Sequence, residues 1–154
     1  MKKQIYERFQ TKDLGTVKFF LSMLVEHERE PQTIFLSPET YLAIIVHRFS
    51  MYNCKASSTL LDPKTKLNLR TEVKESTKIH TYQNAVRSVI YAAIITRPDL
   101  LYATGLVGHF TSNPSTIHWQ AVNRIQRYVR VTKGYQLLLG AGKAVISSEQ
   151  STIQ

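Results

Sequence analysis

The sequence predicts an α+β fold: an N-terminal β-hairpin and one helix, a polar linker, then a three-helix subdomain with a short C-terminal strand. Residues 17–26 and 33–37 are short runs rich in β-branched and aromatic residues, which is typical of strands. Residues 82–134 repeat apolar residues every three or four positions, which is typical of amphipathic helices. With 154 residues and 43% hydrophobic content, the chain is long enough to bury an ordinary core.

We divide the chain into four parts: a hairpin-and-helix unit at 1–53, a linker at 54–81, a helical unit at 82–139 and a disordered tail at 140–154. The linker is polar, contains Asp62-Pro63 and lacks a sustained apolar period. A stretch this long without regular structure favours a separation into two subdomains. Four leucines are candidates for docking part of the linker onto a core: Leu60, Leu61, Leu67 and Leu69.

The N-terminal unit is expected to begin with two strands. Residues 17–26 form the first, buried on much of both faces, and residues 33–37 form the second. A helix then begins with Ser37 as N-cap and Pro38 at the first helical position, and runs to about Phe49. Its buried stripe is predicted to contain Tyr41, Ile44, Ile45 and Phe49 (or Arg48), with Leu42 nearby.

Two helices follow the linker directly. The first covers residues 82–95, and the second begins at Thr96 as its N-cap. Pro98 falls in the first turn of the second helix, where its missing N–H costs nothing. Asp99 complements the positive end of that helix. Residues 135–139 are expected to form the short C-terminal strand.

The last predicted helix, just before Gly134, is the most informative segment. Its apolar stripe consists of Trp119, Val122, Ile125 (or Gln126) and Val129. Arg124, Arg127 and Arg130 repeat every third residue on another side, and Lys133 follows. Two interpretations stay open. The arginine row either contacts the phosphate backbone of a nucleic acid, or is a solvated face whose charges suit a helix C-terminus.

The charge distribution favours a polyanionic partner. The net charge is +9, and residues 82–134 carry six basic groups against a single aspartate. This excess favours nucleic acid over a membrane surface. An acidic protein bound by a basic helical module with no polymerase role is the alternative. The candidate phosphate contacts are Lys18, Arg87, Arg124, Arg127, Arg130 and Lys133.

The sequence lacks the usual signatures of a catalytic site. Its only aspartates are Asp13, Asp62 and Asp99, whereas a two-metal site needs carboxylates that converge on the paired ions. The single cysteine, Cys54, excludes a disulfide framework and a cysteine-based zinc site. His118 is expected to cap or pack rather than act as a base. We therefore predict no catalytic residue, bound metal or cofactor in this chain.

Nothing in the sequence predicts export or membrane insertion. The N-terminus lacks the apolar run of a signal peptide, and no window approaches the ~20 apolar residues of a membrane span. We expect an intracellular protein, either cytoplasmic or nuclear, without a membrane partner.

Several short motifs occur in a fixed order. They are YQNAVRSVIY at residues 82–91, TRPD at 96–99, SNP at 112–114, HW at 118–119 and RYVRVTKG at 127–134. Together they resemble the C-terminal part of the reverse-transcriptase region of copia-type retrotransposon polyproteins. That family carries Y-x-x-x-V-G-S-L-x-Y, T-R-P-D, S-N-P, H-W and R-Y-L-K-G-T in the same order. The resemblance covers about residues 6–139.

The upstream half is similar to the same family. The DLG at residues 13–15 and the FL at 20–21 match its D-L-G-x-x-x-x-F-L-G, with Ser22 in place of the last glycine. The resemblance implies the end of the palm, a thumb-like helix and the connection toward RNase H. A primer-grip-like hairpin would contain Asp13, Leu14, Gly15, Phe20 and Leu21.

The parent activity is RNA-templated DNA synthesis with Mg²⁺. No Tyr-x-Asp-Asp box precedes Asp13, and the RNase H carboxylates do not follow Leu139. The resemblance therefore implies a catalytically incomplete fragment that at most binds nucleic acid. Its expected partners are an RNA or DNA template–primer and the missing palm and RNase H portions of the polyprotein.

Overall fold

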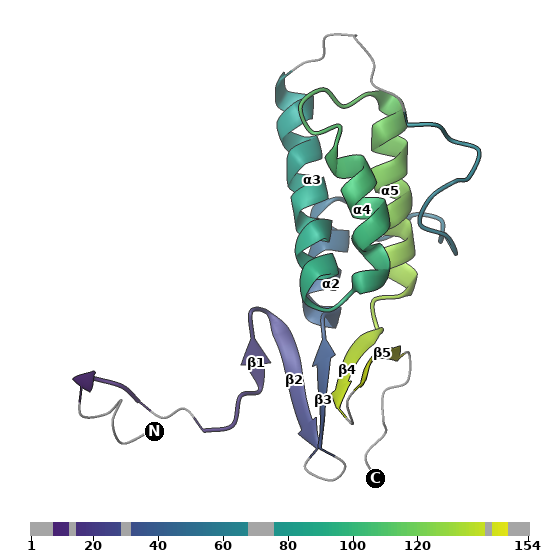
Figure 1. Ribbon diagram of the computed structural model, residues 1–154. Coiled ribbons are helices and arrows are strands. Elements are labelled where there is room, and N and C mark those ends of the chain that lie inside the picture. The colour runs from purple at the N-terminus through teal and green to yellow at the C-terminus, as the bar shows by residue number, and fades with distance from the viewer. Residues whose placement is uncertain (1–7, 13–14, 29–31, 68–75, 141–142, 148–154) are drawn as a thin grey trace.

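A computed structural model describes residues 8–12, 15–28, 32–67, 76–140 and 143–147. It confirms the predicted mixture of strands and helices. A five-stranded antiparallel sheet has its strands in sequence order, β1 to β5. A bundle of helices stands on one end of this sheet, because β3 leads into α2 and α5 leads into β4 (Figure 1).

The N-terminal part of the sheet differs from the prediction of one long strand at 17–26. β1 covers Phe19–Phe20 and β2 covers Met23–Glu28. The chain reverses between them at Leu21 and Ser22, whose φ angles are +50° and +65°. A two-residue turn with both residues left-handed is the common hairpin turn, usually marked by Asn or Gly. Leu-Ser carries neither, so the sequence pattern could not indicate the reversal.

The centre of the sheet agrees with the prediction, and its C-terminal edge corrects it. β3 covers Thr33–Ser37 and β4 covers Gln136–Gly140, close to the two predicted strands. They pair with each other although all the helices from α2 to α5 lie between them in sequence. β5, Lys143–Ser147, pairs with β4, so the prediction of a disordered tail is wrong there. The open edge of β4 supplies hydrogen-bonding groups that a weakly patterned segment can use.

α2 covers Glu39–Arg48, close to the predicted span. Its N-cap is Pro38 rather than Ser37, although the Ser37 hydroxyl accepts a long 3.5 Å bond from the Glu39 N–H. The predicted buried stripe is rotated slightly. Ile44 is 50% exposed, while Val46 is buried, because α2 is covered by α3 and α5 on the side that Leu42, Ile45 and Val46 share.

The remaining helices are α3 (Ser76–Ile95), the 3₁₀ turn η1 (Pro98–Leu100), α4 (Leu101–Gly108) and α5 (Thr116–Val131). Residues 76–81, assigned to the linker, are therefore helical. Thr96 does not cap the next helix: it is fully buried, and its hydroxyl donates back to the Ala92 carbonyl at 3.5 Å.

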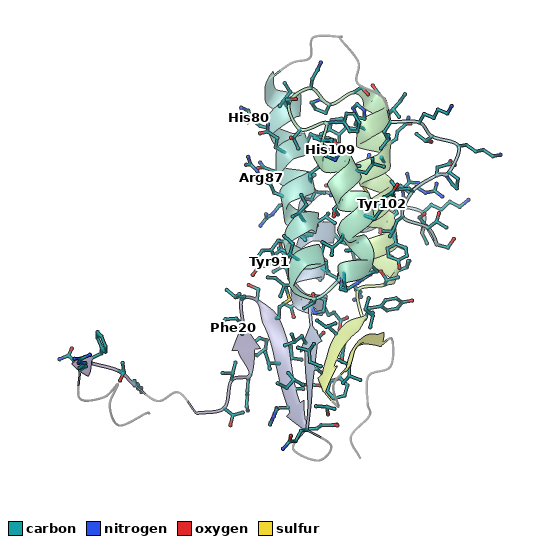
Figure 2. The ribbon with its side chains drawn as sticks, in the orientation of Figure 1. Phe20, His80, Arg87, Tyr91, Tyr102 and His109 are labelled. Carbon is teal, nitrogen blue, oxygen red and sulfur yellow. The ribbon has the colours of Figure 1, made fainter. Side chains whose placement is uncertain are left out.

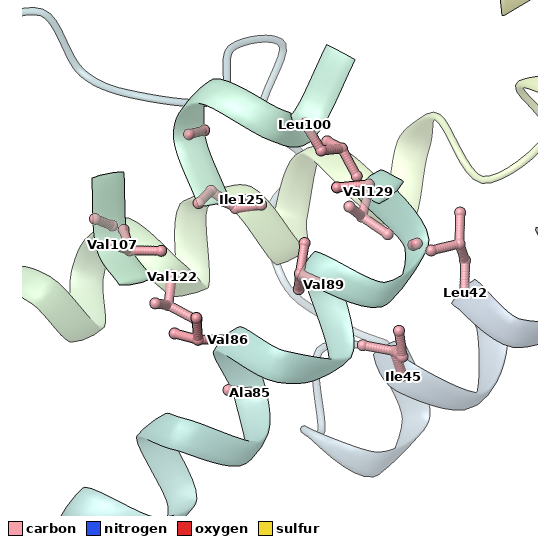
Figure 3. Packing of buried hydrophobic residues seen from close by; sticks show 14 of the residues in the cluster. Leu42, Ile45, Ala85, Val86, Val89, Leu100, Val107, Val122, Ile125 and Val129 are labelled. Atoms are coloured by element: carbon pink, nitrogen blue, oxygen red, sulfur yellow. The ribbon is translucent and has the colours of Figure 1, made fainter. Parts of the chain in front are cut away.

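One apolar cluster joins the helices α2, α3, α4 and α5. It contains Leu42 and Ile45 of α2, Val86 and Val89 of α3, and Val122 of α5, among others (Figure 3). Leu60, Leu61 and Leu67 of the linker pack against the same cluster, which confirms their predicted docking, while Leu69 lies outside the described residues. The division into domains stays a prediction, although its two folded units share this core.

Candidate nucleic-acid interface

The TRPD motif builds a buried ion pair that our candidate residues did not include. Arg97 is fully buried. Its Nε and Nη2 atoms donate to the two carboxylate oxygens of Asp99, at 2.9 and 2.7 Å. The same guanidinium donates to the Thr132 carbonyl at 2.7 Å and to the Thr132 hydroxyl at 2.8 Å. Asp99 therefore serves this ion pair instead of only complementing a helix dipole.

Aromatic rings complete the surroundings of Arg97. The guanidinium carbon lies 5.9 Å from the ring centre of Tyr128 and 5.1 Å from that of Tyr135. The Tyr128 hydroxyl donates to Asp99 at 3.3 Å. A buried arginine with a bidentate partner and further hydrogen bonds is stable only while all of them stay in place. This cluster fastens η1 to the C-terminal end of α5. The signal available in the sequence was the TRPD motif itself.

Each arginine of the predicted row on α5 makes a hydrogen bond within the protein. Arg124 Nη2 donates to the Thr59 hydroxyl at 2.6 Å, and Arg130 Nη1 donates to the Tyr52 carbonyl at 2.5 Å. Arg127 Nε donates to the Asn123 carbonyl at 3.3 Å. The Arg124 and Arg130 contacts hold the loop of residues 52–67 against α5, whereas the Arg127 bond lies within α5 itself. No acidic side chain of the described residues pairs with any of the three.

Lys133 differs from the three arginines. Its Nζ lies 3.2 Å from Glu39 Oε1, and both side chains are partly exposed. Such a pair contributes little stability and is screened by salt. It nevertheless supplies a local counter-charge, so Lys133 is a weaker phosphate candidate than the arginines.

Two cavities lie beside the basic row. The first, about 560 Å³, opens between the loop, α4 and α5, with Asp62, Tyr102, Arg124 and Arg127 among its lining residues. The second, about 630 Å³, is lined by residues including His47, Tyr52, Arg130 and Lys133. Each cavity therefore combines an exposed tyrosine with two long basic side chains. The loop creates both, because it forms one wall of each.

The other two phosphate candidates lie apart from this surface. Lys18 borders a cavity on the sheet, which it shares with Glu26 and Glu28. Arg87 is exposed on the outer face of α3 with His80, on the far side of the bundle from Tyr102 in Figure 2. The structure therefore brings together four of the six predicted contacts, those on and just after α5.

Part of the primer-grip-like hairpin is described. Gly15 has a φ of +76°, which suits the turn expected there, while Asp13 and Leu14 lie outside the described residues. Phe20 and Leu21 are at the β1–β2 reversal, and the Leu21 carbonyl accepts a 2.8 Å hydrogen bond from the Tyr91 hydroxyl (Figure 2). The hairpin is thus fastened to α3.

The HW motif has a structural role. The Ser115 N–H donates to His118 Nδ1 at 2.9 Å in a capping box at the start of α5. The His118 ring stacks on Phe110 with centres 3.9 Å apart, and Trp119 meets Tyr82 edge-on at 5.3 Å. These contacts confirm that His118 caps and packs and that Trp119 belongs to the core.

Three tyrosines of the bundle are harder to ionise than usual. Burial raises the pKa of Tyr82, whose hydroxyl donates to the Val107 carbonyl at 2.8 Å. Burial also raises the pKa of Tyr41 and of Tyr128, and the Asp99 carboxylate raises that of Tyr128 further. These phenols are therefore neutral hydrogen-bond donors at ordinary pH.

The described residues contain neither a metal-binding cluster nor a membrane-spanning helix. No group of three or more His, Cys, Asp or Glu side chains there is arranged to hold a metal ion. No helix there is both long and apolar enough to cross a membrane.

Comparison with known proteins shows which proteins the chain is similar to. It is 36% identical over 151 residues to the retrovirus-related Pol polyprotein from transposon TNT 1-94 of Nicotiana tabacum. It is 32% identical over 139 residues to that from transposon RE1 of Arabidopsis thaliana. The chain is homologous to a region of retrotransposon Pol polyproteins. The matches cover 95% and 90% of this chain, and they confirm the resemblance to copia-type polyproteins.

The chain spans about a tenth of the length of these polyproteins, 11% and 9% respectively. A shorter relative is an uncharacterized mitochondrial protein of Arabidopsis thaliana, 30% identical over 84% of this chain and 52% of that protein. No protein-family model matches the chain, and no solved structure matches it either.

Proposed function

We propose that this chain is the part of a copia-type reverse transcriptase that follows the catalytic palm and that it binds nucleic acid through α5. The observation that carries the proposal is the row of Arg124, Arg127 and Arg130, which has no acidic partner among the described residues. The order of the DLG, TRPD, SNP and HW motifs supports the placement within the polyprotein.

The loop contacts are compatible with a second role for the arginines. A guanidinium has five N–H donors, and each of these three uses one in the hydrogen bonds described above. Their positive charges are not neutralised by those bonds, since the acceptors are a hydroxyl and two carbonyl oxygens. Arg124 and Arg130 can therefore hold the loop, and all three arginines can still attract a phosphate.

In this role the chain binds the nucleic acid and does not itself catalyse a reaction. DNA synthesis and RNA cleavage would be carried out by other regions of the polyprotein, and Mg²⁺ would be bound there. The relevant partner is a template–primer of RNA or DNA, positioned by contacts to its backbone. Backbone contacts fix the register of a nucleic acid without reading its sequence, which suits a polymerase accessory surface.

The test is the salt dependence of binding to a DNA or RNA–DNA duplex. Each phosphate contact contributes about 0.9 to the slope of log K against log salt. Arg127→Gln should therefore reduce the slope by about 0.9. The matched control is Arg8→Gln, which removes the same charge from an exposed residue outside the candidate set.

Equal slopes for wild type and Arg127→Gln would overturn the assignment of α5 as the binding surface. An equal decrease in both variants would mean that only net charge matters. The same measurement on Lys18→Gln and Arg87→Gln decides whether these two separated residues contribute. Absence of any nucleic-acid binding, together with capture of an acidic protein, would favour the alternative of a protein-interaction module.

A further inference from the structure

The cavity between the loop, α4 and α5 carries features of a nucleotide site. Its volume of about 560 Å³ falls within the range usual for small-ligand pockets. One side is apolar and includes Leu61, Leu67 and Leu106. Arg124 and Arg127 line the same cavity. A flat apolar group with a phosphate attached would match both kinds of lining residue.

Tyr102 provides an aromatic surface at this cavity. It lies at the start of α4 and is 78% exposed, and Figure 2 shows it on the side of the bundle that carries the loop. Its side chain makes no hydrogen bond or ring contact with the described residues. Most of its surface is therefore available to a ligand, and aromatic side chains in such positions stack on unpaired bases.

Arg124 has spare donor capacity beside this ring. Its Nε is buried and has no hydrogen-bond partner among the described residues, although its Nη2 is bound to Thr59. A guanidinium has five N–H donors, so Arg124 keeps donors beyond its bond to Thr59 that can bind a phosphate oxygen. Arg127, three residues further along α5, lines the same cavity and can hold a neighbouring phosphate.

The negative charge of Asp62 favours a neutral base over a phosphate inside the cavity. Its carboxylate accepts a 2.9 Å hydrogen bond from the Lys64 N–H, which fixes it in the wall. A phosphate inside the cavity would be repelled by this charge, whereas a neutral base would not. The phosphates would then bind Arg124 and Arg127, with the base against Tyr102.

We infer that this cavity binds one unpaired nucleotide of a single strand, with the base stacked on Tyr102 and its flanking phosphates on Arg124 and Arg127. The inference rests on the proposed function, since it presumes a nucleic-acid partner. It adds a preference for unpaired bases, because a base inside a duplex has no free face to offer an aromatic side chain.

The experiment compares binding of a short, unstructured oligothymidylate with binding of a DNA duplex. Tyr102→Ala should weaken oligothymidylate binding about five- to a hundredfold, the usual effect of losing one base stack, and leave duplex binding unchanged. Tyr102→Phe should restore wild-type binding, because its ring is retained. The salt slope of Tyr102→Ala should equal that of wild type, because a stacking residue releases no counterion.

Tyr52→Ala is the matched control, since Tyr52 is 70% exposed and borders the neighbouring cavity. Its carbonyl contact to Arg130 involves only the backbone and survives the change. Equal losses in Tyr52→Ala and Tyr102→Ala would overturn the assignment. So would an unchanged affinity of Tyr102→Ala for oligothymidylate while wild type still binds duplex, a result that leaves the proposed function standing. Absence of binding to either probe would instead overturn both.

Discussion

The helical bundle and the β1–β2 hairpin differ in how they accommodate side chains that are costly where they lie. The bundle buries a charged arginine and surrounds it with a carboxylate, a threonine and two aromatic rings. The hairpin leaves Phe19 and Phe20 more than 60% exposed, at 66% and 62%, and turns through two left-handed residues without a glycine. The bundle surrounds its buried guanidinium with internal partners, and the hairpin leaves its aromatic side chains exposed.

This difference indicates where the structure is self-sufficient. Arg97 of the bundle finds its partners at Asp99 and Thr132, and Tyr82 finds one at Val107, all within the described residues. Exposed aromatic side chains on an edge strand are a liability unless something covers them. The hairpin therefore presents apolar surface that the described residues leave uncovered.

The largest effect should come from opening the ion pair of the bundle. Arg97→Leu leaves Asp99 without its bidentate partner and should lower the free energy of unfolding by about 3–5 kcal/mol. Arg87→Leu removes an exposed arginine from α3 and should change it by less than about 0.5 kcal/mol. Urea denaturation of both variants measures the contrast. Similar values for the two would show that the buried cluster contributes no special stability.

The sheet has its own tightly packed position at Gly140. A Cβ atom there would lie 2.6 Å from Thr33 Cγ2 and 2.8 Å from the Gln32 carbonyl oxygen. Gly140→Ala should therefore cost about 1–3 kcal/mol through overpacking. At Gly134 a Cβ atom meets nothing within 4 Å, so Gly134→Ala should be close to neutral. If thermal unfolding gives equal melting temperatures for both variants, the β3–β4 pairing is looser than described.

High pH should destabilise the bundle. The folded pKa of Tyr82 is raised above the unfolded value of 10.0, so its contribution is complete below pH 10 and is lost as pH rises toward the folded pKa. The slope should reach up to about 1.4 kcal/mol per pH unit. Tyr82→Phe should lower stability at neutral pH by about 1 kcal/mol and flatten this dependence. An unchanged slope in the variant would assign the alkaline loss to other groups.

The smallest effect should come from relaxing the hairpin turn. Ser22 has a φ of +65°, which glycine adopts without strain, and the copia-type pattern carries glycine at this position. Ser22→Gly should raise the free energy of unfolding by up to about 1 kcal/mol. Ser112→Gly, at a loop position outside the left-handed set, should lower it slightly. A loss at Ser22 comparable to that at Ser112 would contradict the described turn.

Local sequence patterns predicted secondary structure and buried positions correctly where residues close in sequence determine them. The apolar stripe of α5 predicted the buried positions Val122, Ile125 and Val129, and the β-branched run at 33–37 predicted β3. The motif order predicted the homology with retrotransposon polyproteins. Each of these signals lies within one short segment, where the periodicity of a helix or strand is visible directly.

The tertiary structure alone decided which distant groups meet. Nothing local to Arg97 indicates that Thr132 and Tyr135 will surround it, and nothing local to Arg124 indicates a hydrogen bond to Thr59. The reversal at Leu21 and Ser22 and the pairing of β5 with β4 also depend on partners outside their own segments. Residue patterns predicted the helices and the central strands, and the order of the motifs predicted the family. The position of the loop against the arginines of α5 depends on long-range packing. An apolar helix face and a row of arginines do not by themselves specify which distant segment will contact them.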